Sequence, residues 1–180
     1  MPSTPDELSR LLDPTYLDGV DGLSVDDIRR MRAECQEAEA SLSFLRRLIQ
    51  GRMDIVHAYI DRPAGSTAPD LSTVVDNLAG ILAGPGRAGG RGHNPVLHSP
   101  DTEEMAGLTT ELDDILGADD IGQLAVLDDA RLADLAGRLH ELENRVSSER
   151  RGLHERIDTL QAELVERHKS GRASVDGLLS

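Results

Sequence analysis

Two stretches of the chain carry apolar residues at alternating intervals of three and four positions, the spacing of a helix that packs along one face. The first stretch lies within residues 24–62, and its apolar positions are Met31, Cys35, Ala38, Leu42, Leu45, Ile49, Val56 and Tyr59. The second lies within residues 128–171, and its apolar positions are Leu132, Leu135, Leu139, Leu142, Val146, Leu153, Ile157, Leu160 and Leu164. The pattern therefore predicts two long helices with coiled-coil seams.

The polar residues that flank these stretches predict where each helix begins and ends. Ser24 precedes the first seam, and Asp27 stands three residues later as a capping partner. Pro63 ends this helix because proline cannot continue it. The second helix begins near Asp128, carries the basic last turn "ERHKSG", and stops at Gly171.

The rest of the chain lacks long periodic stretches. Residues 1–23 contain one short amphipathic segment, "PDELSRLLD". Residues 63–127 predict a linker with two short helices, at "DLSTVVDNLAGILA" and "PDTEEMAGLTTELDDILG", separated by the flexible Gly-rich stretch "GPGRAGGRGHNP". Residues 172–180 form a C-terminal tail. The predicted fold class is all-α, with two long helices and short accessory helices.

A polar pattern occurs twice, once on each predicted long helix and in the same phase with its seam. The two copies are 104 residues apart, and the matching seam positions include Ala38 with Leu142 and Ile49 with Leu153. At 100° per residue, the five polar positions of a copy lie within about 80° of each other, so they form one stripe beside the seam. The stripes are Glu39, Ser43, Arg46, Gln50, Asp54 and Glu143, Ser147, Arg150, His154, Asp158.

The residue types in these stripes are suited to a guanine nucleotide. The O6 and N7 edge of guanine accepts hydrogen bonds from an arginine fork, and its N1–H and N2–H₂ groups donate to a carboxylate. Phosphate oxygens accept from arginine and from a serine hydroxyl. Two identical stripes favour a two-fold symmetric ligand, and a cyclic dinucleotide has that symmetry. The connection of about 65 residues can return in either direction, so it leaves the orientation of the helices open.

Composition and charge exclude several functional classes. The 180 residues include one Phe, two Tyr and no Trp, which is more typical of long paired helices than of a compact globular core. The formal charge of −14 argues against DNA or RNA as the main partner, and it favours either a basic protein surface or simple solubility.

Other classes are excluded by missing motifs. Cys35 is the only cysteine and the histidines lack metal-ligand spacing, so we expect neither a disulfide nor a metal site. The sequence contains no nucleophile–base set or phosphate-binding loop, so we expect no catalytic residues and no enzyme activity. It also lacks an apolar run long enough to cross a membrane and a leader peptide, which predicts a cytoplasmic protein.

The pattern E-x3-S-x2-R-x3-Q-x3-D resembles the signature of the RsiG family of actinobacterial anti-sigma factors. It is complete at Glu39–Asp54, and its second copy at Glu143–Asp158 differs only where His154 replaces Gln. The surrounding "RRMRAECQEAEASLSFLRRLIQGRMDIV" and "RRGLHERIDTLQAEL" are also similar to that family. The resemblance covers both long helices but not the Gly-rich middle.

This resemblance implies an antiparallel helical hairpin that binds a dimer of cyclic di-GMP as its regulatory ligand. With the ligand bound, a monomeric chain would sequester a WhiG-type sporulation sigma factor. The ten stripe residues would be the ligand site, with His154 making a weaker or pH-dependent contact because imidazole only partly replaces an amide. Two alternatives are a coiled-coil adaptor without a small ligand and, less favoured, a nucleotide hydrolase.

Overall fold

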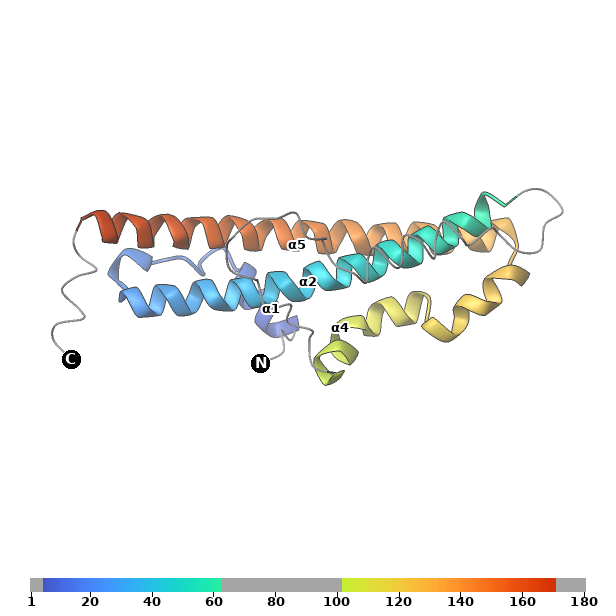
Figure 1. Cartoon of the computed structure of the whole chain (residues 1–180), viewed down its shortest axis with the longest axis horizontal. Coiled ribbons are helices and arrows are strands. Elements are labelled where there is room, and N and C mark those ends of the chain that lie inside the picture. Colours follow the sequence, from blue (N-terminus) through green and yellow to red (C-terminus); the bar gives the residue numbers. More distant parts are fainter. Residues whose placement is uncertain (1–4, 63–101, 171–180) are drawn as a thin grey trace, which may run out of the picture. The chain divides into compact units, whose positions relative to one another are not determined.

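The computed structural model describes residues 5–62 and 102–170, and every regular element in them is helical (Figure 1). Helix α1 spans Pro5–Leu12, the 3-10 helix η1 spans Val20–Gly22, and α2 spans Val25–Ile60. Helix α4 spans Thr102–Ile115, the 3-10 helix η2 spans Ala118–Val126, and α5 spans Asp129–Lys169. This part of the protein is therefore all-α, and α2 and α5 are its long helices.

The short helix expected at "DLSTVVDNLAGILA", the Gly-rich stretch and the C-terminal tail lie outside the described residues. The acidic segment that follows contains α4, where a short helix was expected. The 3-10 helix η2 was not predicted. Its sequence, "ADDIGQLAV", contains a glycine and is only nine residues long, too short for its apolar positions to establish a helical period.

Side-chain caps define the first turns of both long helices. The Ser24 hydroxyl donates to Asp27 Oδ2 at 2.7 Å, and the backbone N–H of Asp27 donates to Ser24 Oγ at 3.1 Å. This is the expected capping pair of α2. At α5 the backbone N–H of Arg131 donates to Asp128 Oδ1 at 2.8 Å. Each cap satisfies an N–H group that has no partner within the helix.

The described residues form two compact units, and α2 and α5 each contribute one half to both. The first unit contains residues 5–43 and 147–170. In it Arg32 donates to Gln161, and Arg150 donates to Glu39, so α2 and α5 run in opposite directions. The apolar side chains buried in this unit are Leu11, Val25, Ile28, Cys35, Ala38, Leu42, Leu153 and Leu160.

The second unit contains residues 44–62 and 102–146. Here Arg46 donates to Glu143 at 2.7 Å and Arg62 lies 3.8 Å from Asp129, so α2 and α5 again run in opposite directions. Its buried apolar side chains are Leu45, Ile49, Val56, Tyr59, Leu112, Leu116, Leu124, Leu132, Leu139, Leu142 and Val146. Among the seam positions expected in the two units, Met31, Leu135, Ile157 and Leu164 are half-buried.

The 104-residue repeat extends to the short elements that precede the long helices. Arg156 donates to the carbonyl of Leu12, at the end of α1, at 2.6 Å. Arg52 donates to the carbonyl of Leu116, just past α4, also at 2.6 Å. Both donor and acceptor are displaced by 104 residues between the two contacts. Each unit therefore holds a short helix by the same arginine-to-carbonyl contact.

The 3-10 helices are held in a similarly repeated way. In the first unit Arg167 donates to the carbonyls of Asp21, at 3.0 Å, and Leu23. In the second unit Arg62 donates to the carbonyls of Ala125 and Leu127, both at 3.5 Å. The acceptors are again 104 residues apart, and the donors 105. Each unit consequently combines a short helix, a 3-10 helix and the first half of one long helix with the second half of the other.

No helix in residues 5–62 and 102–170 has both the length and the apolar character needed to cross a membrane.

Candidate functional site

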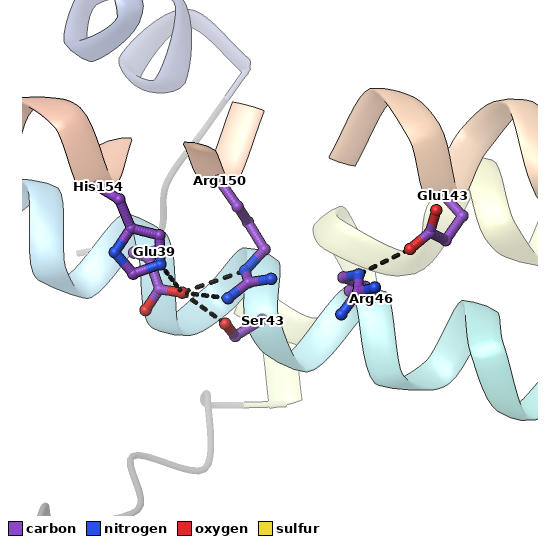
Figure 2. Close-up of polar contacts among 6 residues, drawn as sticks. All are labelled: Glu39, Ser43, Arg46, Glu143, Arg150 and His154. Atoms are coloured by element: carbon purple, nitrogen blue, oxygen red, sulfur yellow. Dashed lines mark hydrogen bonds and ion pairs between the residues drawn. The ribbon is translucent and has the colours of Figure 1, made fainter. Parts of the chain in front are cut away.

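In the first unit, Oε1 of Glu39 contacts three side chains of the two polar stripes. This oxygen accepts from Ser43 Oγ at 2.6 Å, one turn further along α2. From α5 the Arg150 guanidinium donates to the same oxygen through Nη2 at 2.8 Å and Nε at 3.1 Å. His154 Nε2 lies 3.2 Å from it (Figure 2). One carboxylate oxygen thus brings four of the predicted residues together.

This cluster is only partly accessible to water. The side chains of Glu39 and Arg150 are 19% and 23% exposed, whereas that of His154 is 54% exposed. Burial alone would raise the pKa of Glu39, but hydrogen bonds from Ser43 and Arg150 and the positive charge of Arg150 together hold it below its ordinary value. Glu39 is therefore a carboxylate at neutral pH, with its charge balanced by Arg150.

The second unit contains the corresponding pair with the roles of the two stripes exchanged. Arg46 of the first stripe donates through Nε to Oε1 of Glu143 in the second, at 2.7 Å (Figure 2). Glu143 is 14% exposed and Arg46 is 36% exposed. In both units, then, the glutamate of one stripe binds the arginine of the other. A charged helix face that only contacts solvent would not require such ion pairs between the two stripes.

The remaining predicted residues lie outside these ion pairs in the described part of the chain. Gln50 and Ser147 are half-buried, and Asp54 and Asp158 are exposed. Gln50 is the repeat equivalent of His154, but only the His154 side chain contacts the glutamate of its unit among the contacts described. The two units therefore differ at this position.

The clusters present arginine forks, carboxylates and a hydroxyl beside each other. Carboxylates only accept hydrogen bonds and guanidinium groups only donate them. A ligand with a donor edge for the glutamate and an acceptor edge for the arginine could therefore bind both side chains of a Glu–Arg pair. Among the described residues no group of three or more His, Cys, Asp or Glu side chains is arranged to hold a metal ion. The donor and acceptor groups of the clusters are of the kind that can bind an organic ligand with complementary groups.

Sequence reasoning missed the arginines that hold the short elements. Arg52 and Arg156 match in the repeat, but no role was assigned to them, and Arg62 and Arg167 were not singled out. The 104-residue repeat could have paired Arg52 with Arg156. It could not have shown that their acceptors are backbone carbonyls, because any residue supplies a carbonyl.

Comparison with known protein families gives one match. The RsiG-like family matches residues 14–82 and 118–180, and these ranges include all ten stripe residues. A comparison with curated proteins gave no match.

Proposed function

The chain belongs to the RsiG-like family and is an anti-sigma factor, and we propose that cyclic di-GMP, bound by the ten stripe residues, enables it to sequester a WhiG-type sporulation sigma factor. The observation that carries this proposal is the exchanged Glu–Arg pair in each unit. Both units thereby offer the same donor and acceptor groups, as a ligand with two equivalent halves requires.

Guanine fits the polar groups of each pair. The fork of Arg150 suits O6 and N7, and the carboxylate of Glu39 suits N1–H and N2–H₂. Ser43 supplies a hydroxyl to the same cluster, where it can donate to a phosphate oxygen. Arg46 and Glu143 provide the matching groups in the second unit. Because the chain has no Trp and only three other aromatic residues, bases must stack on each other or on a guanidinium, which favours a dimer of the ligand.

We propose that α2 and α5 form an antiparallel coiled-coil hairpin that the ligand makes competent to bind the sigma factor. Within each unit the helices already run in opposite directions. Both stripes are in one chain, so a monomer is sufficient for ligand binding. Each Glu–Arg pair must separate when guanine binds. A tightly bound ligand must therefore satisfy both the carboxylate and the guanidinium that it separates.

Calorimetric titration with cyclic di-GMP, with and without the WhiG-type sigma factor, tests the proposal. We expect about two ligands per chain and a sigma-factor affinity at least roughly tenfold higher when ligand is present. By linkage, the sigma factor must raise ligand affinity by the same factor. Absence of ligand binding in both titrations would contradict the proposal and leave the coiled-coil adaptor as the better interpretation.

We expect His154→Gln to preserve or tighten ligand binding. The imidazole Nε2 lies 3.2 Å from the Glu39 carboxylate oxygen that also accepts from Ser43 and Arg150. This contact opposes the transfer of the carboxylate to guanine, whereas glutamine is the residue that the family pattern carries at this position. Calorimetric titration of the wild type and the variant measures the difference in affinity.

The repeat supplies the matched control for this substitution. Gln50→His places an imidazole at the equivalent position of the second unit, and we expect it to leave ligand binding unchanged or weaker. A large loss of affinity in His154→Gln would instead mean that the imidazole itself binds the ligand.

A further inference from the structure

A hollow of about 440 Å³ lies in the first unit, between the first turns of α2 and the last turns of α5. Four cationic or basic side chains line it: Arg29 and Arg32 from α2, and His168 and Lys169 from α5. We call it the cationic hollow. In a chain with a net charge of −14, this concentration of positive charge runs against the composition. None of these residues belongs to the two polar stripes.

The arginines of the cationic hollow retain capacity to bind an anion. Arg29 is 58% exposed, and its partner Asp26, 2.9 Å away, is 88% exposed, so their ion pair is weak. Arg32 donates through Nη1 to Gln161, and its Nε is a buried donor without a hydrogen-bond partner in the described structure. A guanidinium has five N–H donors. A carboxylate that enters the hollow can therefore bind Arg29 in exchange for its weak, exposed ion pair with Asp26.

The internal repeat shows that the fold does not require these arginines. The residues 104 positions after Arg29 and Arg32 are Ala133 and Ala136, on the first turns of α5. Both alanines lie on a helix that is capped and paired with α2 in its own unit, as the first turns of α2 are paired with α5. The two arginines therefore occur in only one of the two equivalent helix pairs. Such a difference is expected of residues that form a binding surface and not of residues that helix packing requires.

The apolar side chains of the hollow narrow the choice of ligand. Val25, Leu164 and Val165 also line it, and Val165 is 39% exposed. An inorganic anion would leave these side chains unused, and a nucleic acid would be repelled by the rest of the chain. A helix with acidic residues beside apolar ones satisfies both parts of the surface, as in other grooves that bind amphipathic helices.

We propose that the cationic hollow docks an acidic amphipathic segment of the sigma factor. The inference rests on the sigma-factor partnership and, for its probe, on the WhiG type proposed above. Electrostatic complementarity of this kind sets the orientation of the partner and its association rate. The ligand stripes and the hollow would then have separate tasks, one responding to cyclic di-GMP and the other contacting the partner.

The test compares Arg29→Ala/Arg32→Ala with Arg131→Ala/Arg138→Ala. The first variant copies the residues of the other repeat, so its melting temperature should match that of the wild type. The control removes the same charge from exposed positions of the second unit. In calorimetry with the WhiG-type sigma factor and saturating cyclic di-GMP, we expect the first variant to bind roughly tenfold more weakly or worse, and the control to bind within about twofold of wild type.

Val165→Asp provides a second variant, because it places a negative charge in the hollow at an already exposed position. We expect a similar loss. If the hollow variants bind the sigma factor as well as wild type does, the inference is wrong while the proposed function stands. If they lose cyclic di-GMP instead, the hollow belongs to the nucleotide site and the inference is also wrong. If the wild type fails to bind the sigma factor, both the inference and the proposed function are wrong. Titration with cyclic di-GMP alone then still tests whether the stripe residues bind the ligand.

Discussion

Replacing Arg46 and Arg150 together with alanine is expected to lower the affinity for cyclic di-GMP about a thousandfold. A bidentate arginine–guanine contact contributes about 1–3 kcal/mol, so losing two of them removes about 4 kcal/mol, or three orders of magnitude in Kd. Each single variant should lose less, because the other unit keeps its fork. Calorimetric titration measures the affinities, and circular dichroism checks that the helices are retained.

A charge swap separates ligand recognition from ion pairing between the helices. Glu39→Arg combined with Arg150→Glu restores an oppositely charged pair within the first unit, although it reverses which helix carries the positive charge. If the residues bind guanine, the swap should leave the melting temperature nearly unchanged and still weaken ligand binding, because donors and acceptors have changed places. Normal ligand binding by the swapped chain would contradict the assigned site and indicate that these residues only pair the helices.

The long helices could be predicted from the sequence because their signals are local. The Ser24–Asp27 cap depends on two side chains three residues apart, and the structure contains it. Seam positions such as Ala38 and Leu153 follow from a period of 3.6 residues, and both are fully buried. Burial at the seam then places each polar stripe beside it by helix geometry alone.

The pairing between the stripes could not be predicted from the residues, because it depends on how the helices are oriented. The same Glu39 would meet a different part of α5 in a parallel pair, and the connection is long enough for either arrangement. The resemblance to the RsiG family supplied the antiparallel direction. The observed contacts of Glu39 with Arg150 and of Arg46 with Glu143 are those of helices that run in opposite directions within each unit.

Contacts from side chains to backbone carbonyls were also beyond sequence reasoning. Arg167 looks like a routine basic residue at a helix C-terminus, yet only 7% of it is exposed. It donates to three carbonyls of residues 20–23 and to Glu163, which is 2.7 Å away. Nothing in the composition of "VDGL" marks those carbonyls as acceptors.

We expect Arg167→Ala to lower the free energy of unfolding by about 3 kcal/mol. The substitution removes a buried guanidinium that donates to the carbonyls of Val20, Asp21 and Leu23, and among the described contacts only the Val20 carbonyl keeps another donor, the backbone N–H of Leu23. A lost donor costs about 1–3 kcal/mol at a buried acceptor, and because residues 20–23 are half-buried or exposed we expect the sum to stay at about 3 kcal/mol. Urea unfolding followed by circular dichroism measures the change. Hydrogen exchange should also show faster opening of residues 5–23 than in the wild type.

Arg62→Ala is the matched control because Arg62 has the corresponding task in the second unit. Its hydrogen bonds to the carbonyls of Ala125 and Leu127 are 3.5 Å long, and its side chain is 19% exposed compared with 8% for Arg167. Longer bonds at a wetter position contribute less, so we expect a loss of about 1 kcal/mol. Equal losses in the two variants would mean that burial and bond length do not determine the contribution of these arginines. A negligible loss for Arg167→Ala would mean that the packing of Leu11 and Ile28, both fully buried in the first unit, holds the N-terminal segment without it.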